Sequence, residues 1–229
     1  KLMLEMTPDY SLGNNIRCLT LTKNFFDLNK IDSTKDSLFS DFTSYKNLPI
    51  QYMDQVHGNR IQEISLASST VKQTDAMISR SSDLILGVLT ADCLPIAISN
   101  RNGSEFAIIH AGWRGLLSGI IERCLSNFID STNLFAWIGP SISSEHYEVG
   151  SDLYDAFLLS DENSESHFKK LKSGKWLFNI QGQAERILRK HKVKVQNSGE
   201  CSYSNEDLFY SYRRNQTQNR LLTIIWRSK

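Results

Sequence analysis

Two short apolar runs, each ending at a turn signal, constrain the fold of this chain more than any other feature. The run 84–90 leads into Cys93, and the run 106–109 leads into His110 and a segment containing two glycines, 111–115. Short apolar runs bounded by turn signals predict buried strands. A reactive side chain at the end of such a strand is held by a rigid element and can face a cleft. The stretch from residue 89 to 119 therefore predicts a site formed where two strands end.

Strands are predicted more often than helices along the rest of the chain. Alternating or apolar segments predict further strands at 16–22, 50–53, 60–64, 74–78, 134–138, 193–196 and 221–226. Helical spacing predicts helices over 34–46, 115–128 and 151–159 and another after Asn179, while the polar run 160–173 predicts a mobile surface loop. Because strands and helices do not alternate regularly, we expect an α+β fold, not a doubly wound parallel sheet. With 229 residues and no linker or repeat, a single domain over 1–229 is expected.

Composition excludes several classes of partner. The net charge is +1 with scattered Lys and Arg, so the chain lacks the basic patch of a nucleic-acid or acidic-membrane binder. No apolar run approaches the roughly 18 residues of a membrane-spanning helix. The four cysteines are widely spaced and form no Cys-x-x-Cys pair, which favours a reducing compartment. We therefore expect a cytoplasmic protein, either a monomer or a weak homodimer, that acts on small molecules.

His57, Cys93 and His110 form a candidate metal-binding set. Two imidazoles and a thiolate suit zinc, and three protein ligands leave the fourth tetrahedral position open, as in catalytic sites. The same set suits a blue-copper centre, but no axial methionine can be identified, and five histidines are too few for a multicopper oxidase. Taken alone, His57 is equally well interpreted as a residue of a hairpin loop between the predicted strands 50–53 and 60–64.

Several motifs, taken together and in this order, resemble those of the YfiH family. They are DQVHGNR at 54–60, LTADCLPI at 89–96, HAGWRG at 110–115, IGPSIS at 138–143 with HYEVG at 146–150, and FYSYRR at 209–214. The resemblance covers roughly residues 51–226. It implies mixed β-sheets packed face to face with helices outside, in α/β/β/α layers. The family was named for laccase-like polyphenol oxidase activity and is now regarded as a group of zinc-dependent purine nucleoside enzymes.

The resemblance also implies an activity and its ligands. It places zinc on the positions that match His57, Cys93 and His110. It implies a purine nucleoside phosphorylase acting on adenosine, inosine or methylthioadenosine with phosphate, together with adenosine deaminase activity. Zinc makes hydroxide available near neutral pH, so deamination is a chemically natural second reaction. Asp92 or Asp75 is a candidate proton shuttle for it. Asp75 could also be a turn cap or a hydrogen-bond partner, and the sequence alone favours the turn cap.

Phosphate needs positively charged and N–H donors. The segment 111–115 is predicted to be a strand-to-helix turn whose backbone N–H groups favour an anion, and Arg114 adds a bidentate donor there. Arg213 and Arg214 are further candidate donors, and their alternative interpretation is a solvated turn. The family's glycine-rich substrate loop is replaced here by Phe26–Asn29.

Three other functions stay open from the sequence. In the first, Cys93 is a thiolate nucleophile activated by His110 or His57 in a metal-free hydrolase. In the second, the same three residues hold copper in a polyphenol oxidase. In the third, the protein is a non-catalytic partner-binding module. Cys124 lies on the apolar face of the predicted helix 115–128, so we expect a core residue without chemistry.

Overall fold

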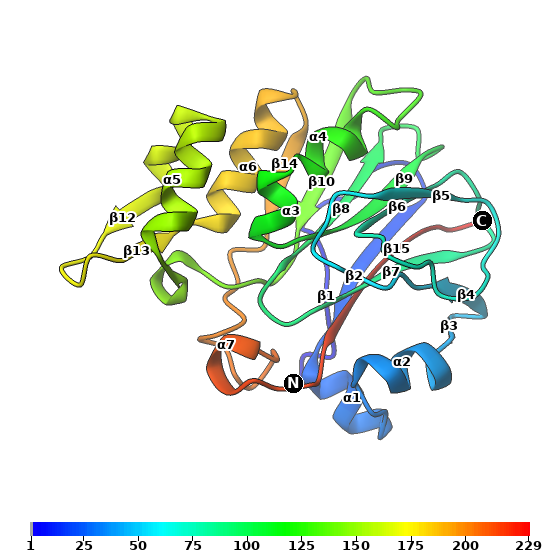
Figure 1. Ribbon diagram of the computed structural model, residues 1–229. Helices are drawn as coiled ribbons and strands as arrows, with labels where there is room; N and C mark the ends of the chain where they lie inside the picture. The colour runs from blue at the N-terminus through cyan, green and yellow to red at the C-terminus, as the bar shows by residue number, and fades with distance from the viewer. Residues whose placement is uncertain (1) are drawn as a thin grey trace.

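The computed structural model describes residues 2–229 and shows two mixed six-stranded sheets (Figure 1). Strands of the first sheet run in the order β1 (Glu5–Met6), β2 (Ile16–Leu21), β15 (Leu221–Arg227), β7 (Ile85–Thr90), β4 (Leu48–Gln51) and β3 (Ser44–Tyr45). Those of the second run in the order β14 (Lys194–Asn197), β10 (Leu134–Ile138), β8 (Leu94–Asn100), β9 (Phe106–Ala111), β6 (Ala76–Ser79) and β5 (Ile61–Ile64). The pairs β4/β7, β5/β6 and β10/β14 are parallel and the others antiparallel, so both sheets are mixed.

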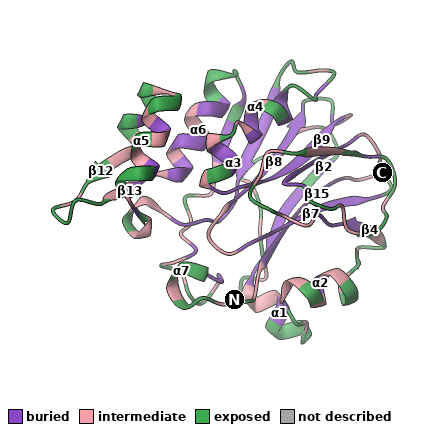
Figure 2. Cartoon of the chain, viewed as in Figure 1, coloured by how far each residue is buried: buried purple, intermediate pink, exposed green. Residues whose placement is uncertain are grey.

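The two sheets face each other across an apolar core. Leu86, Val88 and Ile225 of the first sheet join Ile108 and Trp137 of the second in one buried cluster. Figure 2 shows these strands as the most continuously buried part of the chain. Burial on both faces explains why the strands are near-continuous apolar runs in the sequence.

Helices cover both outer faces, which confirms the predicted α/β/β/α layers. Helices α1 (Lys23–Asn29) and α2 (Lys35–Asp41) bury Phe26 and Leu38 against the first sheet. Helices α3 (Trp113–Leu117), α4 (Ile120–Leu125), α5 (Ser151–Ser160) and α6 (Ile180–Lys190) cover the second sheet. The 3₁₀ turn η1 (Ser144–His146) and the short helix α7 (Tyr212–Asn215) lie in the connections.

Two predicted helices are shorter than their sequence patterns. The pattern over 115–128 becomes α3 and α4, because Gly119 adopts a left-handed φ of 79° that interrupts the helix. Cys124 lies on the buried face of α4 and is fully buried, as expected. The pattern over 34–46 gives only α2, followed by the edge strand β3. Asn179 caps α6 as predicted, since its side chain accepts a hydrogen bond from the Gly182 N–H.

The prediction of a mobile loop over 160–173 was wrong. This segment contains the 3₁₀ helix η2 (Glu162–His167) and the strand β12 (Phe168–Lys170), which joins β13 (Trp176–Phe178) and β11 (Glu148–Val149) in a third sheet. Its hairpin projects from the molecule beside α5 (Figure 1). The rings of Phe168 and Phe178 stack with their centroids 4.3 Å apart, and the Asp161 side chain caps η2. Tyr154 of α5 stacks on Trp176 with ring centroids 3.6 Å apart, so the hairpin is also held against a helix.

The hairpin interpretation of His57 was also wrong. Strand β4 belongs to the first sheet and β5 to the second, so the connection 52–60 crosses between the two sheets. His57 lies on this crossover with a φ of 62°, a left-handed conformation that is uncommon outside glycine.

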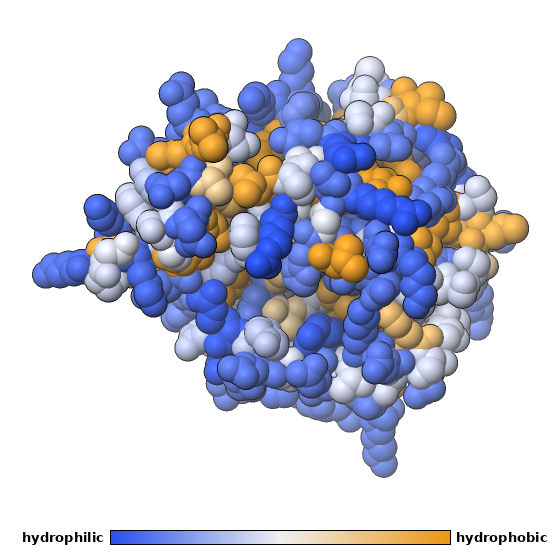
Figure 3. Space-filling model, in the orientation of Figure 1, coloured by the Kyte–Doolittle hydropathy of each residue, from blue (hydrophilic) through white to orange (hydrophobic). Residues whose placement is uncertain are grey.

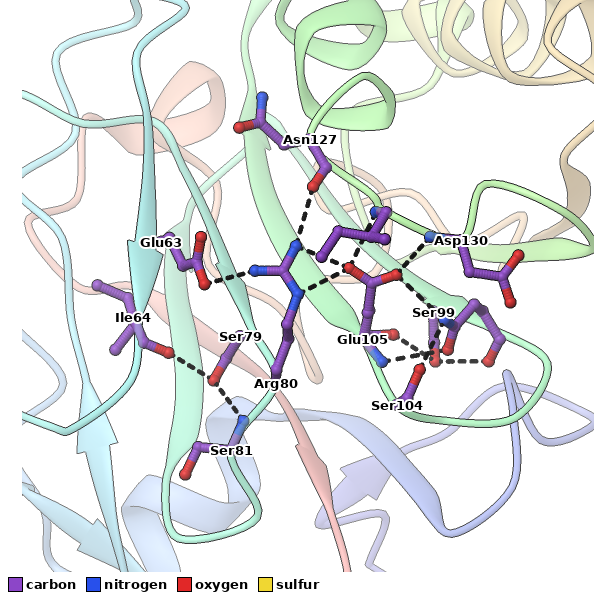
Figure 4. A network of polar contacts seen from close by, with 12 residues as sticks. Glu63, Ile64, Ser79, Arg80, Ser81, Ser99, Ser104, Glu105, Asn127 and Asp130 are labelled. Carbon is purple, nitrogen blue, oxygen red and sulfur yellow. Dashed lines mark hydrogen bonds and ion pairs between the residues drawn. The ribbon is translucent and has the colours of Figure 1, made fainter.

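A buried carboxylate ties the second sheet to its loops (Figure 4). Glu105 forms an ion pair with Arg80 at 2.8 Å, and its two oxygens accept hydrogen bonds from the backbone N–H groups of Ile129 and Asp130. Arg80 also contacts the exposed Glu63. Glu105 is 3% exposed, so its charge is compensated by these contacts and not by water.

The visible molecular surface is mostly hydrophilic, with hydrophobic patches separated by polar side chains (Figure 3). Among residues 2–229, no helix is both long and apolar enough to cross a membrane.

Candidate metal centre and its cleft

His57, Cys93 and His110 come together from two connections and one strand. Cys93 lies in the turn between β7 and β8, His110 is the penultimate residue of β9, and His57 lies on the crossover between the sheets. One ligand atom from each residue lies within 4.8 Å of the other two. The two imidazole rings meet edge to face, with centroids 4.7 Å apart. The predicted metal-binding set is therefore assembled in the folded chain.

Asp75 organises two of the three residues. Its Oδ1 lies 2.8 Å from Nδ1 of His110 and accepts the His57 backbone N–H at 2.9 Å. Its Oδ2 accepts the backbone N–H groups of Val56 and Gly58. Nδ1 of His110 is thereby engaged, which leaves Nε2 as the nitrogen available to a metal. Of the three interpretations of Asp75, the hydrogen-bond partner is the one that the structure supports.

Electrostatics within the centre favour a thiolate at Cys93. Burial would raise the pKa of this thiol, but the charge and hydrogen bond of His110, followed by those of His57, outweigh it and lower the pKa to about 6. Burial would likewise lower the pKa of His110, but the Cys93 thiolate and Asp75 outweigh it and raise the pKa to about 9. Without metal the two groups form a thiolate–imidazolium pair. A thiolate is the form of cysteine that binds zinc.

The absence of a side chain at Gly112 leaves room for two of the three candidate ligands. A Cβ at Gly112 would lie 3.0 Å from His57 Cδ2 and 3.1 Å from the Cys93 sulfur, so only glycine fits without displacing a ligand. Asp92, directly before Cys93, has a φ of 105°, which is strained for a residue other than glycine. The donor set could therefore hold a metal ion, and its chemistry suits zinc or copper.

The centre opens into a cleft of about 430 Å³ between the end of β7 and the segment carrying α7. Its lining residues are Lys35, Gln55, His57, Leu89, Thr90, Ala91, Asp92, Cys93, His110, Ile142, Tyr147, Tyr212, Arg213 and Arg220. Apolar, aromatic and cationic side chains thus surround the three candidate ligands. A volume of this order accommodates a nucleoside-sized ligand.

Two predicted substrate residues line this cleft and contact each other. Asp92 accepts a hydrogen bond from Ser202 Oγ at 2.7 Å and from the backbone N–H of Arg213 at 2.6 Å. The Arg213 guanidinium lies over the ring of Tyr147, 5.1 Å from its centroid, and donates to the Glu148 carbonyl. Asp92 therefore anchors the C-terminal segment against the cleft.

The other two predicted arginines lie elsewhere. Arg214 donates hydrogen bonds to the backbone carbonyls of Ser202, Tyr203 and Phe209, so its guanidinium holds loops together. Arg114 is exposed on α3 with its guanidinium 4.3 Å from the centroid of the Trp113 ring, and it is not among the described residues that line the cleft. The sequence analysis assigned Arg213 and Arg214 the same role, but in the structure only Arg213 lines the cleft.

Several cleft residues were missed by the sequence analysis. Gln55 forms two hydrogen bonds with the backbone of Leu89, which fixes the crossover to β7. Lys35 reaches the cleft from α2 and pairs with Asp54, and Arg220 arrives just before β15. The sequence offers one signal that Gln55 belongs to the site, namely its position two residues before His57. Lys35 and Arg220 carry no motif, because tertiary packing alone brings them to the site.

Comparison with known proteins identifies the family of this chain. The sequence profile of a family described as multi-copper polyphenol oxidoreductase laccase matches residues 27–228. The chain belongs to this family. It is 36% identical over 184 residues, covering 79% of this chain and 75% of the relative, to an Escherichia coli protein named purine nucleoside phosphorylase YfiH. It is 34% identical over 178 residues to a Pseudomonas aeruginosa protein named purine nucleoside phosphorylase, covering 76% of this chain and 73% of the relative.

Solved structures in the family share the fold over nearly the whole chain. A Neisseria meningitidis crystal structure superposes with a TM-score of 0.86 at 26% identity, covering 99% of this chain and all of the other. The crystal structure of Bacillus licheniformis YfiH superposes with a TM-score of 0.78 at 23% identity over 92% of each chain. The resemblance to the YfiH family predicted from the motifs is thus confirmed.

Proposed function

We propose that this protein is a zinc-dependent purine nucleoside phosphorylase. The observation that carries the proposal is the His57–Cys93–His110 set at the floor of a nucleoside-sized cleft, in a chain whose relatives bear that name. Its substrates are adenosine, inosine or methylthioadenosine together with inorganic phosphate. In the reaction a phosphate oxygen bonds to the anomeric carbon as the carbon–nitrogen bond to the base breaks. The base leaves with a proton, and the sugar 1-phosphate is the second product.

The residues of the chain divide into three tasks. His57, Cys93 and His110 hold the metal, and Asp75 fixes the orientation of His110 and the backbone of His57. Zinc held by such a set supplies a Lewis acid toward oxygen. The exposed ring of Tyr212 offers a stacking surface for a purine, and cations on the cleft wall attract phosphate.

Adenosine deaminase activity belongs to the same proposal as a second reaction. It replaces the amino group of adenine by water oxygen, releases ammonia and needs no phosphate. A carboxyl group must move protons in such a reaction. Asp75 contacts His110 and Asp92 lines the cleft beside Cys93, and both accept hydrogen bonds from the protein, so either must exchange a partner to act.

Two observations favour other functions and define the controls. The low pKa of Cys93, about 6, suits a nucleophile in a metal-free hydrolase. The family description names a copper oxidase, and the ligand set accepts copper as well as zinc. A thiolate nucleophile needs no metal and is blocked by alkylation, whereas an oxidase needs copper and oxygen.

Product analysis tests the proposal. Protein loaded with zinc, with copper or with no metal is incubated with adenosine, in phosphate and in phosphate-free buffer, and the products are separated by chromatography. We expect adenine and ribose 1-phosphate with zinc and phosphate only. Deamination by the zinc form should give inosine without phosphate, and inosine with the hypoxanthine cleaved from it in phosphate. Adenine release without phosphate would indicate simple hydrolysis, and full activity of the metal-free form would contradict the zinc requirement.

A further inference from the structure

Asp92, the residue before Cys93, combines a strained backbone with a fully engaged side chain. Its φ of 105° costs free energy in a residue other than glycine, so the surrounding contacts must hold it in place. Its carbonyl accepts the N–H of Ile142 at 2.9 Å. Its Oδ1 accepts the Ser202 hydroxyl at 2.7 Å, and its Oδ2 accepts the Arg213 N–H at 2.6 Å. Strain held in this way is typical of functional sites.

Hydrogen bonds form a closed network between the Cys93 turn and α7. Asp92 accepts the Ser202 hydroxyl, and the Ser202 carbonyl accepts Nη1 of Arg214 at 2.8 Å. Arg214 directly follows Arg213, whose N–H returns to Asp92. We call these contacts the Asp92 network. Because the network is closed, the turn and α7 cannot shift relative to each other without breaking at least one of its hydrogen bonds.

The Asp92 network connects two parts of the cleft through a residue outside it. Cys93 lines the cleft as a candidate metal ligand, while Tyr212 and Arg213 line it from α7. Ser202 is fully buried and is not among the described residues that line the cleft. A change at Ser202 therefore reaches the metal centre and α7 only through the residues that it holds.

We propose that Asp92 and Ser202 are positioning residues that hold the Cys93 turn and α7 as one unit, so that a metal ion at Cys93 and a nucleoside against α7 meet in a fixed geometry. The nucleoside in this statement rests on the proposed function. The inference also separates the two candidate proton shuttles. A shuttle must take up and release a proton, whereas both oxygens of Asp92 are held by donors, one of them a backbone N–H.

Hydrogen exchange of the protein without nucleoside tests the connection independently of activity. Segment 209–216 contains α7 and none of the three candidate metal ligands. The Arg213 N–H within it reports on the network, because its acceptor is Asp92. In the wild type we expect zinc to slow the exchange of this segment. In Ser202→Ala the segment should exchange faster and should no longer respond to zinc. Mass spectrometry of peptic peptides measures both rates.

Ser164→Ala is the matched control. Ser164 in η2 is also buried and accepts a hydrogen bond from Gln183 at 3.1 Å, but it is not among the residues that line the cleft. Both variants lose one buried hydrogen bond, so both should lower the melting temperature by similar amounts. Only Ser164→Ala should keep the response of segment 209–216 to zinc. A wild type without this response, or an equal response in Ser202→Ala, would overturn the proposal.

Kinetics separates failure of the network from failure of the function. With zinc, inosine and phosphate, Ser202→Ala should raise the KM for inosine about 10-fold and change kcat less, because α7 is displaced. Phosphorolysis with equal KM in both proteins would support the phosphorylase and reject the network. The expected exchange result in a protein that never cleaves inosine would support the network and reject the phosphorylase.

Deamination of adenosine in phosphate-free buffer tests the role of Asp92 itself. Ser202→Ala keeps the Asp92 carboxylate and frees one of its oxygens. A positioning residue predicts a higher KM for adenosine in this variant. A proton shuttle predicts an unchanged KM and a kcat equal to or above that of the wild type, and this result would overturn the positioning role.

Discussion

Asp75 is the side chain on which the geometry of the metal centre depends most. It is fully buried and joins His110, the backbone of His57 and the two neighbouring N–H groups. Such a partner fixes the tautomer and direction of a ligating imidazole. One carboxylate therefore links the crossover between the sheets to the end of β9.

Asp75→Asn should weaken zinc binding about 10- to 100-fold, the usual effect of losing a partner behind a ligand. The amide keeps one oxygen as an acceptor but loses the charge that raises the basicity of His110. Competition with a chelating dye measures the affinity. Asp54→Asn is the control, because this carboxylate pairs with Lys35 and not with a ligand. Equal affinities for Asp75→Asn and the wild type would contradict the assigned role.

Cys93 should react as a thiolate in metal-free protein. Because its pKa is lowered to about 6, the thiolate fraction rises as the pH passes upward through 6, and the alkylation rate should follow it. An ordinary cysteine would show this rise near pH 8.5. Zinc should protect Cys93 from iodoacetamide at every pH at which it binds. Mass spectrometry of the peptide containing Cys93 measures the rate, and a midpoint near 8.5 would contradict the lowered pKa.

At the scale of elements, buried Glu105 offers a direct test of how the second sheet is joined to its loops. Glu105→Gln removes a charge that Arg80 and two N–H groups require, so it should lower the free energy of unfolding by about 1–3 kcal/mol. Glu63→Gln is a matched control, because Glu63 meets the same arginine from an exposed position and should change it by less than about 1 kcal/mol. Urea unfolding measures both. Equal losses would show that burial does not set the value of this contact.

Strands β2, β7, β10 and β15 could be predicted from the sequence because each is a short apolar run with clear ends. Strand β8 and the three strands of the third sheet were not predicted. Strand β10 matches its predicted range, and β2, β7 and β15 match to within a residue or two. The assignment of strands to sheets could not be predicted, because both sheets are buried on two faces and the apolar pattern is the same in each. His57 shows the consequence: local signals indicate a hairpin, while the chain crosses between sheets.

Local sequence motifs predicted the three candidate metal ligands but not all of the residues that line the cleft. His57, Cys93 and His110 each stand beside a motif, and the structure brings the three together. Arg214 belongs to a recognisable motif, but its side chain donates hydrogen bonds to loop backbone. Arg220 belongs to no motif, but it lines the cleft. Whether a cation faces a cleft depends on packing between distant segments, which local sequence does not encode.

At the scale of the whole molecule, the two-sheet arrangement explains why the site lies where it does. The sheets pack face to face, and their connections meet at one end, where the ends of β7 and β9 and the crossover 52–60 supply the three ligands. A rigid core on both sides holds these ends in place. The candidate metal centre therefore depends on both sheets, because its three residues lie on the crossover between the sheets, after β7 of the first and in β9 of the second.

Metal content of purified protein tests this account most directly. We expect one zinc ion per chain in the wild type, little or none in Cys93→Ala, and a full complement in Cys124→Ala, which removes a buried thiol far from the ligand set. Elemental analysis of the three proteins, each shown to be folded by circular dichroism, gives the result. Loss of zinc confined to Cys93→Ala would support the His57–Cys93–His110 centre. Full retention of zinc by Cys93→Ala would contradict it.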